Sequence, residues 1–172
     1  MKGGASGGTI ASMLNAIKEA MQDKRIRKII ASPYALCPTG HGFKARQINL
    51  KSPQYDKDVQ AWIAPFVMAA INVRVVHRSN ALLHKQYGEN FLYDEAMITG
   101  SKAKGGMSAA ALTAGLGGFM LAAVLPPTRW LMEKTILPKP GEGPSPRAQQ
   151  DGYYDLRFIG TTQDGQTIRC KV

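Results

Sequence analysis

The chain has 172 residues, of which 44% are hydrophobic and 20% are charged, and this composition excludes a disordered or fibrous protein. Its 22 Lys and Arg side chains outnumber the 12 Asp and Glu side chains by 10, and the first 86 residues hold 13 basic against 4 acidic side chains. Two cysteines, Cys37 and Cys170, are too few for a disulfide framework, so we expect free thiols and a cytoplasmic location.

A glycine-rich loop and two helices are predicted over residues 3–31. The first helix has apolar residues at helical spacing and begins at Ser6 or Thr9, whose hydroxyls can accept backbone N–H groups. Asp23 is expected to cap a second, basic helix that buries Ile26, Ile29 and Ile30. Residues 33–58 show no lasting apolar period and are expected to be irregular.

The middle of the chain is expected to form a helix over 65–83 and a strand over 91–97. Pro65 suits the first turn of a helix, and a mostly buried apolar run follows it. A second helix is predicted over 105–125, where residues 107–125 carry no charge. Its length approaches a bilayer core, but its many Ala and Gly residues insert weakly. A helix packed between neighbours is therefore favoured, and membrane contact stays open.

The C-terminal part is expected to form a Pro/Gly-rich loop over 137–147 and a hairpin over 153–172. Asp164-Gly165 lies between two runs of alternating residues, which is a strong hairpin signal. The chain stops on the second of these strands, so we expect it to be a truncated piece of a longer protein and treat residues 1–172 as a single domain.

Three groups of residues are candidates for binding. The glycine-rich loop can direct backbone N–H groups at an anion. Arg74 and Arg78 lie four residues apart on one helix face and suit a carboxylate or phosphate, although pairing with Asp94 or Glu95 is an equal alternative. A structural role is equally open for the stiff loop near residue 140. The candidate substrate- or cofactor-facing residues are Ser6, Gly7, Gly8, Thr9, Arg74, Arg78, Ser79, Asn80, Lys139 and Glu142.

Several chemistries have no support in the sequence. The run Gly40–Ala45 matches G-x-G-x-x-A, but Pro38 precedes it and no acidic residue stands at the offset that a ribose requires. His77 and His84 are two helical turns apart, too far to share a metal simply, and no metal site is expected. The sequence contains no Gly-x-Ser-x-Gly motif, so it gives no support to serine-hydrolase chemistry. No catalytic residue can be assigned.

Five segments in this order resemble the saccharopine dehydrogenase-like oxidoreductases, which include bacterial trans-acting enoyl reductases. They cover residues 6–13, 64–68, 78–81, 87–95 and 139–145, and the string Lys139-Pro-Gly-Glu-Gly-Pro-Ser145 is the most specific of them.

This resemblance implies an α+β fold: a mixed, largely antiparallel sheet covered by helices, forming the substrate-side domain that follows a Rossmann domain absent from this chain. It implies NAD(P) in the full-length protein and none bound by this chain alone, which is then inactive by itself. The glycine-rich loop is expected near the cofactor or substrate, and the basic half is expected to face nucleotide phosphates or the missing N-terminal Rossmann domain. A homodimer is a further expected partner.

Two functional hypotheses follow. The first is the substrate-side domain of an NAD(P)-dependent oxidoreductase, such as an enoyl reductase acting on a lipid-like acyl substrate. The second is a non-catalytic module, peripheral to a membrane, in which the 107–125 helix and the basic half bind anionic lipid. Nucleic-acid binding is not expected, because the basic residues lack interleaved aromatics or a known module.

Overall fold

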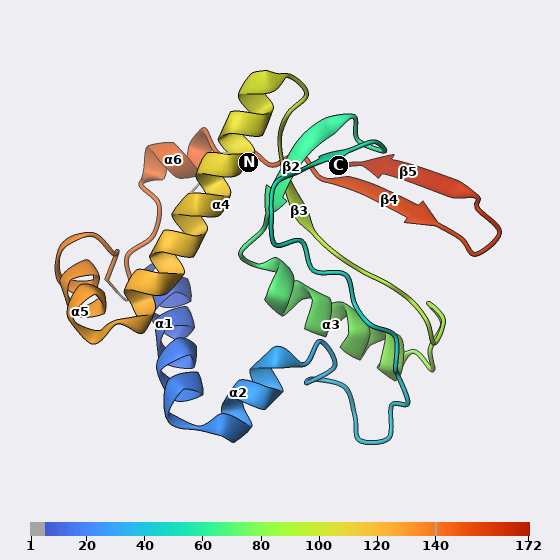
Figure 1. Cartoon of the computed structure of the whole chain (residues 1–172), viewed down its shortest axis with the longest axis horizontal. Helices are drawn as coiled ribbons and strands as arrows, with labels where there is room; N and C mark the ends of the chain where they lie inside the picture. Colours follow the sequence, from blue (N-terminus) through green and yellow to red (C-terminus); the bar gives the residue numbers. More distant parts are fainter. Residues whose placement is uncertain (1–5, 140) are drawn as a thin grey trace. The chain divides into compact units, whose positions relative to one another are not determined.

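A computed structural model describes residues 6–139 and 141–172. Its elements, coloured along the sequence in Figure 1, are α1 (Gly7–Gln22), α2 (Lys24–Ala31), β1 (Gln54–Asp56), β2 (Ala61–Pro65), α3 (Ala69–Leu82), β3 (Ala96–Gly100), α4 (Ala103–Val124), α5 (Pro126–Thr135), α6 (Pro146–Gln150), β4 (Arg157–Thr161) and β5 (Thr167–Lys171). They confirm the α+β class with antiparallel pairing.

The chain divides into two compact units. The central unit is Lys18–Val124, and the terminal unit combines the residues up to Ile17 with Leu125–Val172. The central unit contains a three-stranded antiparallel sheet in the order β1-β2-β3, and the terminal unit contains the β4–β5 hairpin.

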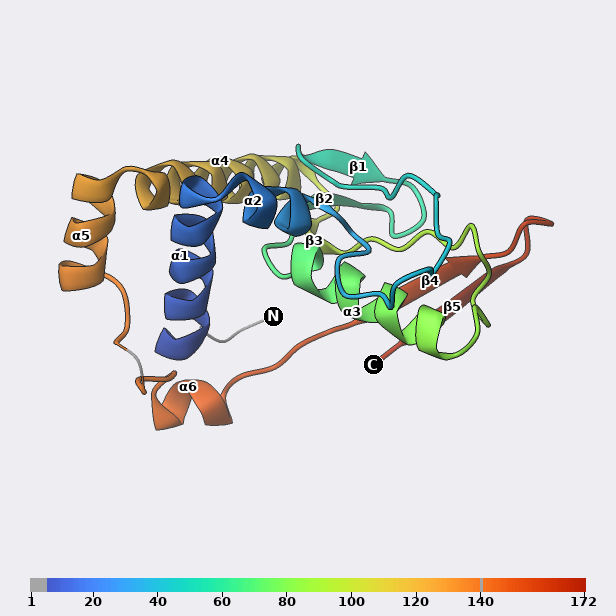
Figure 2. The same ribbon diagram turned by 90° about the horizontal axis from the view of Figure 1, so that it is seen from below.

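The first part of α4 packs against the sheet of the central unit (Figures 1 and 2). The Thr99 hydroxyl on β3 lies 3.0 Å from the carbonyl oxygen of Trp62 and 2.8 Å from that of Gly105, so it links two strands to the helix. A Cβ at Gly105 would collide with the Gly100 carbonyl, and one at Gly106 would lie 3.0 Å from the Trp62 ring. Glycine at these two positions therefore permits the close approach.

The core of the central unit is small and centres on β2. Ala61, Ile63 and Ala64 are buried there, as are Val73 of α3 and Ala109 of α4. Because β2 pairs with a strand on each side, its backbone groups are used in the middle of the sheet.

The predicted helix over 65–83 begins too early. Pro65 is the last residue of β2 and pairs with Ala96, and a turn in which the Ala69 N–H donates to the Phe66 carbonyl precedes α3. The apolar run after Pro65 is therefore a turn followed by a helix. It is also not mostly buried, since only Val73, His77 and Asn80 of α3 are buried among the described residues. The segment 33–58 is irregular except for β1 at its end.

The predicted strand over 91–97 is also displaced, since β3 covers Ala96–Gly100. The backbone groups of Phe91 and Tyr93 form hydrogen bonds with the Gln47 side chain instead of with a neighbouring strand. The Gln47 amide donates to the Phe91 carbonyl at 3.1 Å and accepts from the Tyr93 N–H at 3.1 Å. One glutamine thus takes the place of a β-ladder partner.

The helical expectations need two further corrections. No residue of α2 is buried, so the prediction that this helix buries Ile26, Ile29 and Ile30 was wrong. The predicted cap is confirmed, since the Asp23 carboxylate accepts a hydrogen bond from the Arg25 N–H. In α4 only Gly105, Ala109 and Ala123 are buried among the described residues. The helix expected over 105–125 therefore forms, but it is not a buried core helix in this chain.

The terminal unit joins distant parts of the sequence. The Gly7 N–H at the start of α1 donates to the Glu142 carbonyl at 2.8 Å. Pro146 opens α6, a short helix that the predicted 137–147 loop did not include, and Ser145 caps it. The β4–β5 hairpin lies within the predicted range, with Gly165 at φ 85° in its turn.

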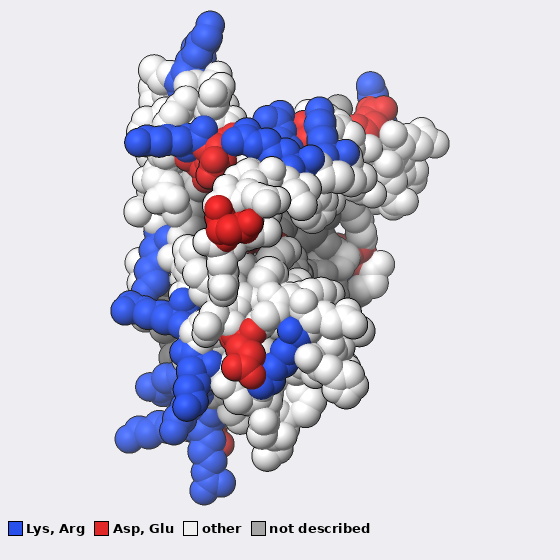
Figure 3. Space-filling view, turned by 90° about the vertical axis from the view of Figure 1, so that its right-hand side faces the viewer, with Lys and Arg blue, Asp and Glu red and all other residues white. Residues whose placement is uncertain are grey.

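Most of the surplus positive charge of the first half is exposed, and Arg74 and Lys85 are the half-buried exceptions among its described basic residues. Figure 3 shows Lys and Arg side chains projecting from one face, where Asp and Glu occupy smaller patches.

Candidate functional site

The central unit holds a cavity of about 350 Å³ at the start of α3. This volume lies within the range of small-molecule sites. It is lined by the end of α2, an extended segment, α3 and one carboxylate: Ala31, Pro33, Tyr34, Ala45, Arg46, Gln47, Ile48, Asn49, Ala69, Ala70, Val73, Arg74 and Asp94.

A network around Gln47 shapes one wall of the cavity. Besides its bonds to Phe91 and Tyr93, the Gln47 amide donates to the Tyr34 hydroxyl at 2.7 Å, and that hydroxyl donates to the Ala45 carbonyl at 2.5 Å. These bonds hold two irregular segments together where no sheet is available. Polar groups in the wall are therefore positioned before a ligand arrives.

Asp94 is the half-buried acid of this cavity. Burial raises the pKa of its carboxyl most, and the nearby negative charge of Glu95 raises it further. Hydrogen bonds from the backbone N–H groups of Glu95 and Leu50 lower it in part. A carboxyl that retains its proton more readily than usual suits a proton donor. Arg46 lies exposed at the same cavity and can attract an anionic group.

The next carboxylate, Glu95, is held by two neutral side chains. Tyr93 donates its hydroxyl to one Glu95 oxygen at 2.7 Å, and the Asn72 amide of α3 donates to the other at 2.7 Å. Burial and this carboxylate raise the pKa of Tyr93 to about 12. The arrangement anchors the segment before β3 to α3 and thereby fixes the position of Asp94.

The predicted arginine pair serves the chain's own backbone. Arg74 donates to the carbonyls of Ile30, Ser32 and Ala70, and Arg78 donates to the Leu36 carbonyl. Arg74 therefore satisfies carbonyls at the end of α2, and burial lowers its pKa. The alternative partners, Asp94 and Glu95, do not accept these hydrogen bonds, and the predicted role in binding an anionic group stays a prediction; Arg74 does line the cavity.

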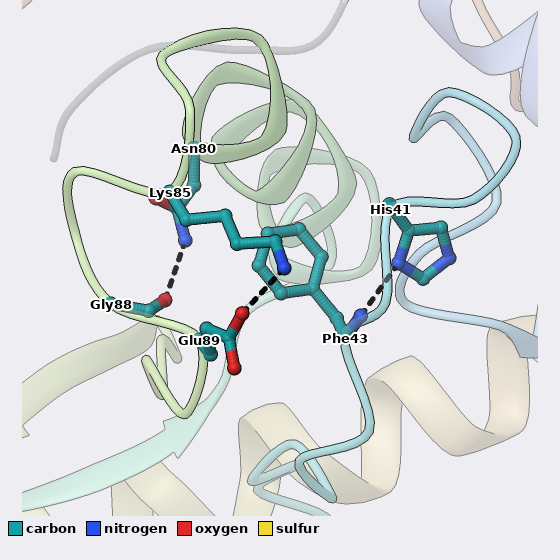
Figure 4. Close-up of polar contacts among 6 residues, drawn as sticks. All are labelled: His41, Phe43, Asn80, Lys85, Gly88 and Glu89. Atoms are coloured by element: carbon teal, nitrogen blue, oxygen red, sulfur yellow. Dashed lines mark hydrogen bonds and ion pairs between the residues drawn. The ribbon is translucent and has the colours of Figure 1, made fainter.

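Asn80 and Ser79 also act within the protein. Asn80 is fully buried, and its amide donates to the Gly88 carbonyl at 2.9 Å and accepts from the Tyr87 N–H at 2.9 Å. The Ser79 hydroxyl donates to the Val75 carbonyl. Figure 4 shows Asn80 facing Gly88 across the loop that follows α3. These contacts fasten the loop.

The same close-up shows how the loop meets the aromatic cluster. Lys85 lies 2.6 Å from the Glu89 carboxylate and 5.9 Å from the centre of the Phe43 ring, and the Phe43 N–H donates to His41 Nδ1 at 3.0 Å (Figure 4). Gly40 and Gly42, the glycines of the G-x-G-x-x-A match, have φ near 80° in an irregular segment. This context is not the strand–turn–helix of a dinucleotide site.

The other predicted group gathers in the terminal unit. Ser6 accepts from the Thr9 N–H, the Lys139 N–H donates to the Glu142 carboxylate at 2.8 Å, and the Glu142 N–H donates to the Lys139 carbonyl. The Gly7 bond to the Glu142 carbonyl adds the N-terminus of α1 to this group. The backbone N–H groups of Gly7 and Lys139, which the predicted anion site would use, already donate to Glu142. Residues 3–5 of the glycine-rich loop lie outside the described residues.

Sequence reasoning missed Tyr34 and Gln47, and it considered Asp94 only as a partner of the arginines. The available signal for Asp94 was an acidic pair, Asp94-Glu95, directly after the aromatic-rich run Phe91-Leu92-Tyr93. Gln47 lies in an irregular segment and gave none. In the described part of the chain no three His, Cys, Asp or Glu side chains come together in a way that could hold a metal ion.

Comparison with known proteins places the chain beside oxidoreductases: it is similar to proteins named as enoyl reductases. A Mycobacterium tuberculosis protein with trans-acting enoyl reductase in its name is 36% identical over 176 residues, which are 95% of this chain and 41% of that protein. The trans-acting enoyl reductase of Mycobacterium bovis is 35% identical over 96% of this chain and 41% of its own length. That of Mycobacterium ulcerans is 30% identical over 94% of this chain and 40% of its own length.

The chain thus spans about two fifths of the length of these relatives. No family model and no solved structure matches it. The resemblance to trans-acting enoyl reductases is supported, and the wider saccharopine dehydrogenase-like assignment stays a prediction.

Proposed function

We propose that this chain is the substrate-side part of an NAD(P)-dependent enoyl reductase that acts on an apolar acyl substrate. The observation that carries the proposal is its similarity, over 95% of its length, to a protein with trans-acting enoyl reductase in its name. The cavity at Asp94 supports it, because an enoyl reduction requires a proton donor next to the reacting carbon.

The described residues do not fit a nicotinamide nucleotide. Its pyrophosphate needs a glycine-rich turn between a strand and a helix. The G-x-G-x-x-A match is irregular, and the Gly7 N–H at the start of α1 is bonded to Glu142. We therefore assign the nucleotide to a Rossmann domain outside this chain and derive no step through it.

The part of this chain in the reaction is to bind the acyl group and supply a proton. Saturation of a carbon–carbon double bond beside a carbonyl requires a proton at the carbon next to that carbonyl. We assign this role to Asp94 at the cavity, because its raised pKa keeps a larger share of its carboxyl protonated than in an exposed aspartate. Arg46 is available to an anionic carrier group at the rim.

A separate apolar groove of about 560 Å³ suits the acyl chain. Its walls come from β2, β3 and α4, and the residues lining it are Pro65, Val67, Met97, Ser108, Ala111, Leu112, Gly115 and Leu116. Seven of these eight residues are apolar or glycine, so the groove favours hydrocarbon over a polar ligand.

A chimera tests the proposal directly. This chain replaces the aligned segment of the Mycobacterium bovis trans-acting enoyl reductase, and oxidation of NADPH is followed with a medium-chain trans-2-enoyl thioester. We expect turnover by the chimera and a loss of at least about a hundredfold in Asp94→Asn, in line with removal of a general acid. The matched control Asp164→Asn, in the exposed turn of the hairpin, retains the parent rate.

The pH profile separates proton donation from a structural role. If Asp94 is the donor, kcat falls as the pH rises through the pKa of its carboxyl, and Asp94→Asn loses this limb. A chimera that is folded by circular dichroism but oxidises no NADPH, while the parent relative does, refutes the proposed function.

A further inference from the structure

The segment between α2 and β1 contains a stretch of extended backbone that belongs to no sheet. Residues 41–51 have no turn or bend, and Figure 1 shows them as a coil that passes α3 on the way to β1. From residue 43 to residue 48, buried or half-buried residues alternate with exposed ones, which is the period of a strand. The exposed members are Lys44, Arg46 and Ile48. We call the backbone of these three residues the 44–48 edge.

The hydrogen bonds of the central unit leave this edge unused. In an extended chain the N–H and C=O groups of alternate residues point to the same side. The side that includes Ala45 is tied to the protein, because its carbonyl accepts from the Tyr34 hydroxyl. The backbone groups of Lys44, Arg46 and Ile48 have no hydrogen-bond partner among the described residues. The 44–48 edge therefore offers the donors and acceptors of a strand that has no neighbour on that side.

The unused edge has a definite length. Leu50, the next residue on the same side, already donates its N–H to the Asp94 carboxylate. Gly42, two residues before Lys44, has a φ of 76°, which interrupts the extended conformation. The edge between these two points is about 13 Å long, which suits a short segment of one additional strand.

Positive charge surrounds this edge. Residues 24–55 contain seven Lys and Arg side chains and no Asp or Glu, and all seven are exposed. Neither Lys44 nor Arg46 takes part in an ion pair with a described residue. These two side chains point to the same face because they are two residues apart. They therefore match acidic side chains at alternate positions of an opposing strand.

The hydrogen-bonding groups of the edge distinguish between partners. Nucleic acids and lipid headgroups present phosphate oxygens, which accept hydrogen bonds but would leave the C=O groups of the edge without donors. A second copy of the chain carries the same basic side chains on its own edge, and like charges opposite each other destabilise a strand pair. An acidic peptide supplies both kinds of backbone group and the complementary charge.

We propose that the 44–48 edge binds an extended acidic segment of a partner protein as an additional β-strand. Backbone hydrogen bonds hold the segment, its acidic side chains face Lys44 and Arg46, and an apolar side chain contacts Ile48, which is 57% exposed. Because Arg46 and Ile48 also line the cavity, the bound segment lies at the cavity rim. This inference is independent of the enoyl reductase assignment.

Fluorescence anisotropy with the 172-residue chain tests this proposal. The probe is a fluorescein-labelled octapeptide in which glutamate alternates with threonine. We expect saturable binding that weakens as the salt concentration rises. An octapeptide with N-methylated backbone amides keeps the charge but cannot complete the strand pair, and one with glutamine for glutamate keeps the backbone groups without the charge. Each should bind at least about tenfold more weakly than the probe.

Variants of the chain separate the charge from the backbone. Lys44→Glu should weaken binding at least about tenfold, whereas Lys57→Glu, the same change in the turn between β1 and β2, retains most of it. Ile48→Pro removes one N–H of the edge and no charge, and it should weaken binding about tenfold; Ile48→Val keeps this N–H and retains binding. Circular dichroism establishes that each variant is folded. Hydrogen exchange at the amides of Lys44 and Arg46 should slow when the probe binds.

Three outcomes overturn the proposal. The first is a folded chain that binds no probe, or that binds the N-methylated octapeptide equally well. The second is an oligothymidylate that binds as tightly as the probe and loses as much with Lys44→Glu, which assigns the surface to a phosphate polymer. The third is binding of the probe by this chain but not by the chimera described above, which assigns the 44–48 edge to a strand in the remainder of the longer protein.

Discussion

Protonation of His77 should destabilise the central unit in mild acid. His77 is 1% exposed on α3 and packs against the rings of Tyr34, Phe43 and Phe91 at centroid distances of 4.9, 6.1 and 6.0 Å. Neither ring nitrogen has a hydrogen-bond partner among the residues that the structure describes. Burial therefore lowers the pKa of His77 below its ordinary value of 6.5.

The sign of the pH effect follows from this shift. Well above pH 6.5, the ordinary pKa of histidine, His77 is neutral in both the folded and the unfolded chain, so its protonation has no effect on stability. As the pH falls below this value, the unfolded chain takes up a proton that the folded chain refuses. Stability is then lost until the pH reaches the folded pKa, at up to about 1.4 kcal/mol per pH unit.

The measurement compares His77→Leu with the parent and with His84→Asn, a change at an exposed histidine. Urea unfolding, monitored through amide hydrogen exchange in α3, gives the free energy of unfolding at pH 6.5 and one unit below. The parent and His84→Asn should lose more free energy of unfolding over this unit than His77→Leu does, by up to about 1 kcal/mol. Equal losses in all three proteins would show that His77 is protonated in the fold and refute the reasoning.

Two further predictions concern single contacts. Gly7→Ala should lower the free energy of unfolding by about 1–3 kcal/mol, because its Cβ would collide with the Lys139 carbonyl. The control Gly8→Ala, whose Cβ has open space, should be neutral or stabilising by up to about 1 kcal/mol. A lower urea midpoint for Gly8→Ala than for Gly7→Ala would contradict this. Asn80→Ala should cost about 2 kcal/mol by leaving the buried bond to Gly88 unmade, and an unchanged thermal midpoint would rule out its role in fastening the loop.

Local signals in the sequence located several elements correctly. Ser6 accepts the Thr9 N–H at the start of α1, Asp23 caps α2, and Asp164-Gly165 forms the turn between β4 and β5. Each of these depends on a backbone preference or a hydrogen bond that spans only a few residues. Such features are determined almost wherever the segment is placed.

The segments that sequence reasoning misplaced depend on distant partners. The stretch before β3 is not a strand because Gln47, more than forty residues earlier, supplies its hydrogen bonds. The Arg74 and Arg78 donors likewise reach carbonyls of α2 and the following turn. Periodicity along the chain contains no information about such partners.

The sequence by itself determined the α+β class, the helix caps, the apolar character of α4 and the surplus of positive charge. Tertiary structure decided that Asp94 reaches a cavity, that Arg74 and Arg78 donate to backbone carbonyls, and that much of α4 is exposed. The physical reason is range: conformational preferences and capping act over a few residues, whereas burial, pKa shifts and side-chain partners depend on which distant segments meet in space.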